Sequence, residues 1–189
     1  DGGKEIWANA PAALAPSIQK DIPEVESAMR MLKHDFGSTA YIKAANNDYE
    51  EKELYWTDPG IINMFDMEFV KGNPNEALKA PSTVILSETI ANKYFGTENP
   101  VGQQIIIDNR TTLTVTGVYK DFPKNSSVSC AIIGAFSTLN FFRNPTWDNA
   151  SFETFVLLNQ TASSTAVTDK IQQVLNKNVA KDKQWFSFT

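Results

Sequence analysis

One histidine, one cysteine and one cluster of carboxylates are the side chains through which this chain of 189 residues could do catalytic chemistry. His34 is the only imidazole, so a Ser-His-Asp, Cys-His or histidine-metal site would have to use it. No partner residue stands at a spacing typical of such a site. We therefore interpret His34, at the end of an expected strand beside a turn, as a solvated surface residue.

The carboxylates Asp48, Glu50, Glu51 and Glu53 lie close together in the chain. Two of them could form an acid and base pair of the kind that hydrolyses glycosides, so a hydrolase is one hypothesis. A charged hairpin turn followed by a solvated strand face explains the same residues, and we favour it. Cys130 stands among apolar neighbours, which indicates a buried small side chain rather than a nucleophile.

The glycines of KYFGTENPVGQ, residues 93–103, raise the question of phosphate binding. A phosphate-binding loop needs two glycines with four residues between them, followed by Lys and then Ser or Thr. Here five residues separate Gly96 from Gly102, Gln103 follows, and Glu98 would repel an anion. The stretch therefore predicts a turn, in which Gly96 ends a helix and Pro100 with Gly102 leads the chain into a strand.

Composition narrows the class of protein further. A net charge of −5 with scattered Lys and Arg argues against nucleic-acid binding, and 42% hydrophobic residues indicate a folded chain. No apolar run at the start resembles a signal peptide, and no window approaches the ~20 apolar residues of a membrane span. The chain starts without Met and ends in KQWFSFT. We expect a domain of a longer protein, with membrane helices outside both ends.

The first third predicts a helix followed by antiparallel strands. Apolar spacing favours a helix over residues 11–21, which Pro23 would terminate. Residues 25–33 read as a strand and residues 38–44 as its partner. A further strand is expected where Leu54 and Trp56 share one face.

The middle of the chain is mostly β in pattern. STVILSE predicts a buried strand, and Ser87 is a suitable N-cap for a helix from Glu88 to about Phe95, after which Gly96 would adopt the left-handed conformation. QQIIID and TTLTVTGVYKD predict two strands around a polar turn at residues 108–110. We expect Asp58, Asp66 and Asp121 to bond turn amides.

The last third predicts a strand, a helix and another strand. FETFVLLN is strand-like, and QWFSF would begin a final strand. The helix between them, SSTAVTDKIQQVLNKNVAKD, carries one apolar stripe and should be capped by Ser164 or Thr165; the stripe consists of Val167, Ile171, Val174, Leu175 and Val179. The aromatic pairs Phe141-Phe142 and Trp185-Phe186 fit either a core or an exposed sugar or partner surface. The pattern predicts an α+β fold of two subdomains, with the middle inserted into a βαβ-type unit built from both ends.

Several short segments occur in the order found in one family. They are Phe-x-Phe-x3-Gly ending at Gly72, Ala77-Leu78, Pro81 before VILSE, Ala91-x-x-Tyr-Phe-Gly, Asn99-Pro-Val-Gly102, Val115-Thr-Gly-Val118 and Asp121-x-Pro123-x-Asn125-Ser126. In this order the chain resembles the MacB-like periplasmic domain of FtsX-type ABC transporter permeases. The resemblance covers residues 12–128 well and the last sixty only in element order.

The resemblance implies a division into two named subdomains. A Porter-like α/β part would comprise residues 1–59 and 123–189, and a β-rich Sabre-like part with one short helix would comprise residues 60–122. It also implies structural rather than catalytic roles for the motif residues, which are Gly72, Phe95, Gly96, Pro100, Gly102, Gly117, Val118, Asp121 and Pro123.

The resemblance further implies a mechanical function without catalysis, cofactor or metal. The domain would lie on the periplasmic side of the cytoplasmic membrane and transmit ATP-driven motion of its own transmembrane helices. ATP would be hydrolysed by a separate cytoplasmic subunit or domain, and the intact permease would act as a dimer. The partner moved would be an adaptor, a lipoprotein or a cell-wall enzyme. The alternative is an extracytoplasmic domain that binds a small ligand or glycan in an aromatic pocket, with Trp147 or Trp185.

Overall fold

The computed structural model describes residues 9–126, 128–139 and 144–184, and these form a mixed α+β fold, as predicted. The chain is divided into two compact units. One combines the residues up to 30 with those from 144 onward, and we call it the terminal unit. The other, residues 31–143, is a single continuous segment that we call the central unit.

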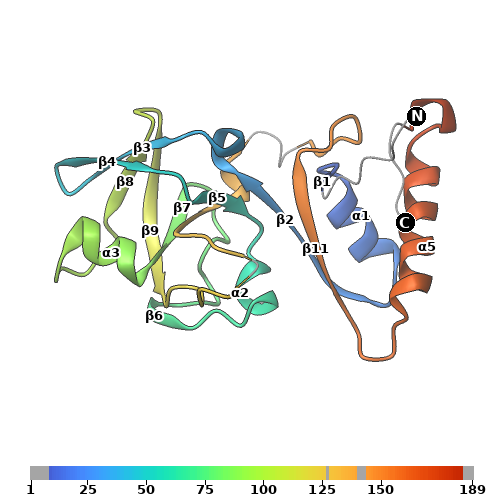
Figure 1. Ribbon diagram of the computed structural model, residues 1–189, viewed down its shortest axis with the longest axis horizontal. Helices are drawn as coiled ribbons and strands as arrows, with labels where there is room; N and C mark the ends of the chain where they lie inside the picture. The colour runs from blue at the N-terminus through green and yellow to red at the C-terminus, as the bar shows by residue number, and fades with distance from the viewer. Residues whose placement is uncertain (1–8, 127, 140–143, 185–189) are drawn as a thin grey trace. The chain divides into compact units, whose positions relative to one another are not determined.

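The terminal unit packs two helices against a small sheet (Figure 1). Its strands run in the order β1, β11, β2, and β1 pairs with β11 in antiparallel orientation. Its core contains Leu14, Ile18 and Val25 together with Val167 and Val174. The elements are β1 (Asn9–Ala10), α1 (Leu14–Asp21), β2 (Val25–Lys33) as far as Arg30, β11 (Phe152–Leu158), α5 (Ser164–Asn178) and the 3-10 turn η3 (Lys181–Lys183).

The central unit is built on a larger mixed sheet. The strand order is β5, β10, β7, β9, β8, β3, β4; the end of β2 pairs with β5, and β6 pairs with β9. The elements are η1 (His34–Gly37), β3 (Ala40–Ala44), β4 (Asn47–Glu51), β5 (Leu54–Thr57), α2 (Ile61–Met64), β6 (Phe69–Gly72), β7 (Thr83–Ser87), α3 (Glu88–Phe95), β8 (Gln104–Ile107), β9 (Thr111–Tyr119), β10 (Ile132–Ala135) and η2 (Phe136–Thr138).

The middle of this sheet is buried on both faces. Every residue of β7 is buried, and so is every residue of β10 beside it. β7 is parallel to β9, and β10 is parallel to β5. Continuous apolar runs such as VILS are typical of strands buried on both faces, whereas half-exposed strands alternate. β7 and β10 therefore lie in the core of the central unit.

Most of the predicted elements are confirmed. Helix α1 ends at Asp21, before Pro23, and β2 covers residues 25–33. The side chains of Leu54 and Trp56 are both buried. Ser87 caps α3, its hydroxyl oxygen accepting from the N–H of Ile90 at 3.3 Å, and α3 covers residues 88–95. Cys130 is buried, as expected.

The expected pairing of residues 25–33 with residues 38–44 is wrong. β3 pairs with β4 and β8, and β2 pairs with β5. The turn between β2 and β3 contains three successive residues with positive φ, Asp35, Phe36 and Gly37, at 42°, 53° and 97°. The chain is redirected there, and the backbone N–H of Tyr41 donates to the carboxylate of Asp108 at 2.9 Å, beside β8.

Two helix ends differ in detail from the prediction. Gly96 has φ 58° but ψ −121°, so it lies outside the left-handed helical region, although its N–H still bonds the carbonyl of Asn92. Helix α5 is capped by Ser163 rather than by Ser164 or Thr165. The strand expected at QWFSF and the pairs Phe141-Phe142 and Trp185-Phe186 fall partly or wholly outside the described residues.

The boundaries between the two compact units fall after residues 30 and 143, whereas the expected subdomain boundaries fall after residues 59 and 122. Residues 31–59 pack in the central unit, because β5 pairs with β10 and β3 pairs with β8. The segment after 122 also remains there as far as residue 143, since β10 inserts between β5 and β7. Assignment of the two units to Porter and Sabre subdomains stays a prediction.

Two glycines allow β6 to lie close against β9. Gly72 is paired with Gly117 and has φ +86°. A Cβ atom at Gly72 would stand 2.3 Å from the carbonyl oxygen of Thr116, closer than any real contact. A Cβ atom at Gly117 would stand 2.5 Å from the ring of Phe69. Glycine is therefore required at residue 72 both by the backbone conformation and by the space.

A comparison of two glycine variants tests this close approach. Gly102 has nearly the same φ, +90°, but a Cβ atom there meets nothing within 4 Å. We expect Gly102→Ala to lower the free energy of unfolding by about 1 kcal/mol, the cost of a left-handed non-glycine residue. Gly72→Ala should lower it by more than about 2 kcal/mol, because a backbone clash is added. Urea denaturation measures both, and equal losses would contradict the close approach.

Candidate functional site

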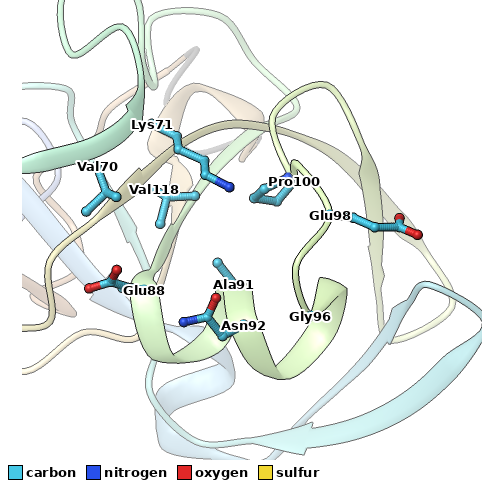
Figure 2. A pocket seen from close by; sticks show the side chains of 9 residues that line it. All are labelled: Val70, Lys71, Glu88, Ala91, Asn92, Gly96, Glu98, Pro100 and Val118. Carbon is cyan, nitrogen blue, oxygen red and sulfur yellow. The ribbon is translucent and has the colours of Figure 1, made fainter.

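The loop after α3 surrounds a small hollow rather than a ligand site. Figure 2 shows the hollow between α3, β6 and the segment from Gly96 to Pro100, with the Lys71 side chain directed across it. Its volume is about 30 Å³, room for about two water molecules, since one water needs about 10–15 Å³ of such space. A phosphate-bearing ligand does not fit. The structure agrees with the interpretation of the glycine loop as a turn, and the N–H of Gly102 donates to the carbonyl of Val115 at 2.8 Å.

The structure brings three of the family-motif residues together and leaves the others apart. Gly96, Pro100 and Val118 line the hollow of Figure 2. The remaining residues have separate packing roles: Gly72 and Gly117 form the β6–β9 approach, Phe95 is buried, Gly102 turns the chain, Asp121 bonds α3 and Pro123 is exposed. They do not converge on one reactive centre.

Asp121 bonds the first turn of α3. Its Oδ2 atom accepts from both the backbone N–H and the hydroxyl of Thr89, each at 3.1 Å. A carboxylate there stabilises unpaired N–H groups and the positive end of the helix. This confirms the expectation that Asp121 binds a backbone amide.

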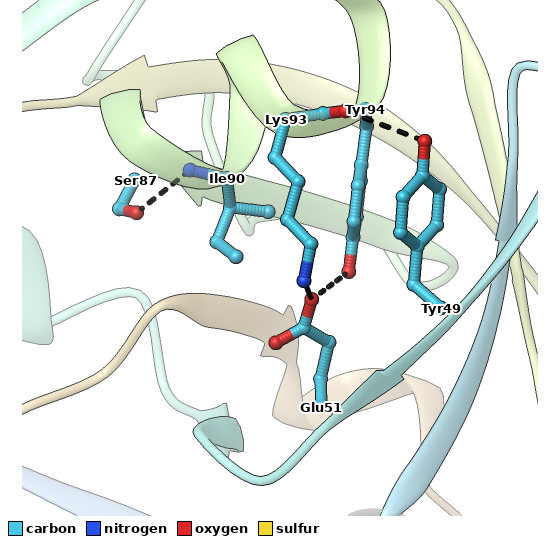
Figure 3. A network of polar contacts seen from close by, with 6 residues as sticks. All are labelled: Tyr49, Glu51, Ser87, Ile90, Lys93 and Tyr94. Carbon is cyan, nitrogen blue, oxygen red and sulfur yellow. Dashed lines mark hydrogen bonds and ion pairs between the residues drawn. The ribbon is translucent and has the colours of Figure 1, made fainter.

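A polar network joins α3 to β4 (Figure 3). The Oε1 atom of Glu51 accepts from the ammonium of Lys93 at 2.6 Å and from the hydroxyl of Tyr94 at 3.0 Å. The hydroxyl of Tyr49 donates to the carbonyl of Lys93 at 3.3 Å, and the rings of Tyr49 and Tyr94 lie 4.4 Å apart. One carboxylate thus fixes two side chains of the same helix.

Burial changes the pKa of two tyrosines near this helix. Desolvation raises the pKa of Tyr94 well above 10, and the negative charge of Glu51 raises it further. Desolvation also raises the pKa of Tyr119, whose hydroxyl donates to the carbonyl of Cys130 at 2.7 Å. Both hydroxyls are therefore held neutral as structural donors.

The four clustered carboxylates do not form an acid and base pair. Glu51 binds α3, while Glu53 pairs with Lys33 at 3.2 Å and Asp48 lies 3.9 Å from Lys43. Glu50 follows Tyr49 on β4 and lies opposite Tyr41. Successive strand residues point to opposite faces, so Glu50 and Glu51 diverge. The predicted hairpin is confirmed by the pairing of β3 with β4, but the predicted solvated face is wrong for Glu51, whose side chain is only 13% exposed.

The interpretation of His34 as a solvated surface residue is wrong. Its side chain is 16% exposed, Nδ1 accepts from the indole N–H of Trp56 at 3.0 Å, and Nε2 lies 2.7 Å from Oδ2 of Asp108. An indole nitrogen can only donate, so the Nδ1 atom carries no proton and Nε2 donates to the carboxylate. Sequence reasoning missed this network because Asp108 stands 74 residues away, and no local pattern signals such a contact.

The described part of the chain holds neither a membrane-spanning helix nor a cluster of metal ligands. Within it, no helix combines the length and apolar character needed to cross a bilayer. Nor do three or more His, Cys, Asp or Glu side chains in that part gather as metal ligands would.

The raised pKa of Tyr94 predicts a loss of stability at alkaline pH. Unfolded tyrosine ionises near pH 10, whereas folded Tyr94 does not. Its contribution to the free energy of unfolding is therefore complete below about pH 10 and falls as the pH rises further. Tyr94→Phe should flatten this fall in urea denaturation between about pH 9 and pH 11. The control Tyr41→Phe, which removes an exposed hydroxyl, should keep it. A Tyr94→Phe slope equal to that of the unmodified chain would refute the prediction.

Three solved structures share the fold of the chain. A domain of a putative permease from Porphyromonas gingivalis matches with a TM-score of 0.81 at 24% identity, over 95% of this chain and 76% of that one. The periplasmic region of MacB from Actinobacillus actinomycetemcomitans matches with a TM-score of 0.68 at 18% identity, over 89% and 74%. The extracellular domain of the noncanonic ABC-type transporter YknZ from Gram-positive bacteria matches with a TM-score of 0.65 at 17% identity, over 90% and 84%.

The sequence itself matches a family model. None of the curated proteins compared with the chain matches it. The model of the MacB-like periplasmic core domain, however, matches residues 2–174. Because this match extends over most of the chain and the three structures share its fold, the chain belongs to the family of MacB-like periplasmic core domains and is the extracytoplasmic domain of an ABC transporter permease.

Proposed function

We propose that this domain transmits ATP-driven movement of transmembrane helices to a periplasmic partner or to the exported substrate. Such a function requires that both ends of the domain be joined to membrane helices, so that a displacement of either end moves the whole. It also requires stiff units, because a soft body would deform before it transmitted a force.

The observation that carries the proposal is the joint packing of the two ends in the terminal unit. β1 pairs with β11, and α1 lies beside α5 (Figure 1). Lys177 pairs with Asp21 at 3.0 Å, and Lys170 pairs with Glu24. The hydrogen bond from Lys170 lowers the pKa of Glu24, which stays charged at neutral pH. A displacement of one end is thereby passed to the other.

The interior of the central unit supports the proposal by its stiffness. Its middle strands are buried on both faces, and Glu51 ties α3 to the β3–β4 hairpin. Asp121 and Ser87 both bond the first turn of the same helix. A helix held at both ends cannot swing independently of the sheet.

Family membership supports the remaining parts of the proposal. ATP would be hydrolysed by a cytoplasmic ATPase subunit or domain, and this domain would itself catalyse nothing. The permease would act as a pair of copies, and the moved partner would be an adaptor, a lipoprotein or a cell-wall enzyme. A stand-alone ligand sensor is the weaker proposal, because the named relatives are parts of permeases and transporters.

Spin labels on the central unit test the transmitted movement. In the full-length permease with its ATPase, Cys130→Ala removes the thiol of this domain, any other cysteine is likewise replaced, and Phe36→Cys places a label on a side chain that is 77% exposed. We expect the distance between labels of two copies to change when ATP replaces ADP. A catalytically dead ATPase should abolish this change. Identical distance distributions in the two nucleotide states would refute the proposal.

Weaker packing in the terminal unit should reduce the coupling, that is, the transmission of movement from the membrane helices, without stopping ATP hydrolysis. Val174, on α5, is 6% exposed and belongs to the core that joins α1 to α5. Val174→Ala should lower the free energy of unfolding by about 2 kcal/mol and reduce the nucleotide-dependent distance change. The ATPase rate should persist.

A matched variant separates coupling from general destabilisation. Val115 is fully buried in the central unit, and Val115→Ala removes the same two methyl groups without touching the α1–α5 core. This variant should lose similar stability and keep the distance change. Equal loss of coupling in both variants would show that the terminal unit has no special role.

A further inference from the structure

An open groove lies in the terminal unit beside the C-terminal end of α5. Its volume is about 760 Å³, within the range of ~300–1,000 Å³ found for small-molecule sites. The lining residues are Thr146, Trp147, Asp148, Asn178, Val179, Ala180 and Lys183. All of them belong to the terminal unit.

Both walls of the groove are held in place. The carbonyl of Thr146 accepts from the N–H of Ala13 at 3.2 Å, which ties the first wall to α1. On the second wall the side-chain amide of Asn178 donates to the carbonyl of Val174 at 2.8 Å. The amide of Gln184 donates to the carbonyl of Val179 at 2.8 Å. The lining is therefore positioned before any ligand arrives.

The indole of Trp147 has two neighbourhoods. The side chain is partly buried: it packs against the core cluster that contains Leu14 and Val174, and it also lines the groove. We take the part of the indole that lines the groove as a flat apolar platform. Aromatic rings of this kind bind the C–H face of a flat ligand at a low cost in conformational entropy.

Hydrogen-bonding groups surround the platform. Asp148 supplies carboxylate oxygens, one of which accepts from the hydroxyl of Thr146. Asn178 supplies an amide, and Lys183 supplies an ammonium that forms no ion pair with another described residue. These groups both donate and accept, and they carry opposite charges. A ligand with many hydroxyl groups, each a donor and an acceptor, satisfies such a set.

The same lining disfavours other ligands. Four of its seven side chains, Thr146, Asp148, Asn178 and Lys183, are polar, and a lipid chain offers no group that could bond them. A nucleotide or other polyanion would meet one ammonium and one carboxylate. A metal ion would find a single carboxylate.

We propose that this groove binds a short saccharide, one ring of which lies on Trp147 while its hydroxyl groups bond Asp148, Asn178 and Lys183. The site is independent of force transmission, since it needs neither membrane helices nor ATP. It adds a recognition function for glycan on the extracytoplasmic side of the permease.

Saccharide titration of the chain of 189 residues tests the site. The probes are triacetylchitotriose and maltotriose, followed by the indole N–H signals in ¹H–¹⁵N spectra. We expect saturable shifts of the Trp147 signal with at least one probe, and a Kd of about 1 mM or tighter. No saturation with either probe up to about 10 mM would overturn the proposal, as would binding of phosphatidylglycerol vesicles at this groove instead.

Substitutions of the lining residues test whether these side chains bind the saccharide. Trp147→Ala removes the reporting indole, so its affinity is measured by titration calorimetry, and it should be weaker at least about tenfold. Lys183→Ala keeps the test valid should the tryptophan variant fail to fold, because Lys183 is exposed. Asp148→Asn, which preserves shape, should also weaken binding. The control Tyr41→Ala removes an exposed ring in the central unit and should leave the affinity unchanged. Unchanged affinity in both Lys183→Ala and Asp148→Asn would overturn the assignment.

Discussion

The parallel pairing of β7 with β9 is the constraint on which the central unit depends. Parallel neighbours cannot be joined by a tight turn, so the chain must return across the sheet before the second strand begins. Helix α3, the loop from Gly96 to Gly102 and β8 make up this return. Gly96 and Gly102 resemble the glycines of a nucleotide-binding loop because a crossover also needs sharp turns. The turns of this crossover account for both glycines without a ligand.

The return path also determines what holds α3. β8 pairs with β9 on one side and with β3 on the other, and β3 continues into the β4 hairpin. The last residue of β4 is Glu51, whose carboxylate bonds Lys93 and Tyr94 on α3. The crossover is thus closed by hydrogen bonds to one carboxylate: Glu51 is 13% exposed, whereas its charged partner Lys93 is 44% exposed. Hydrogen bonds to an ionised group are stronger than those between neutral groups.

The terminal unit and the central unit each have a packed core of their own, and a mechanical role requires such stiff units. Both outer segments of the chain share one hydrophobic core, in which α1 and α5 meet. Two ion pairs, Lys177 with Asp21 and Lys170 with Glu24, also link the first segment to α5. The central segment forms its own core, and its aromatic side chains Trp56, Tyr94 and Tyr119 are buried and hydrogen-bonded. Closely packed cores whose aromatic rings are fixed by hydrogen bonds resist deformation, as the proposed transmission of movement requires.

Local signals in the sequence determined most of the elements: the N-cap at Ser87, the apolar runs of β7 and β9, and the stripe of α5 each depend on neighbours within a few residues. They also determined the family, because the ordered motif from Gly72 to Ser126 is itself a sequence pattern. The tertiary structure alone decided the partner of β3, the network of His34 with Trp56 and Asp108, and the bond of Glu51 to α3. These contacts join residues 22 to 74 positions apart, and hydrophobic periodicity specifies which face a residue occupies but not which distant residue it will meet there.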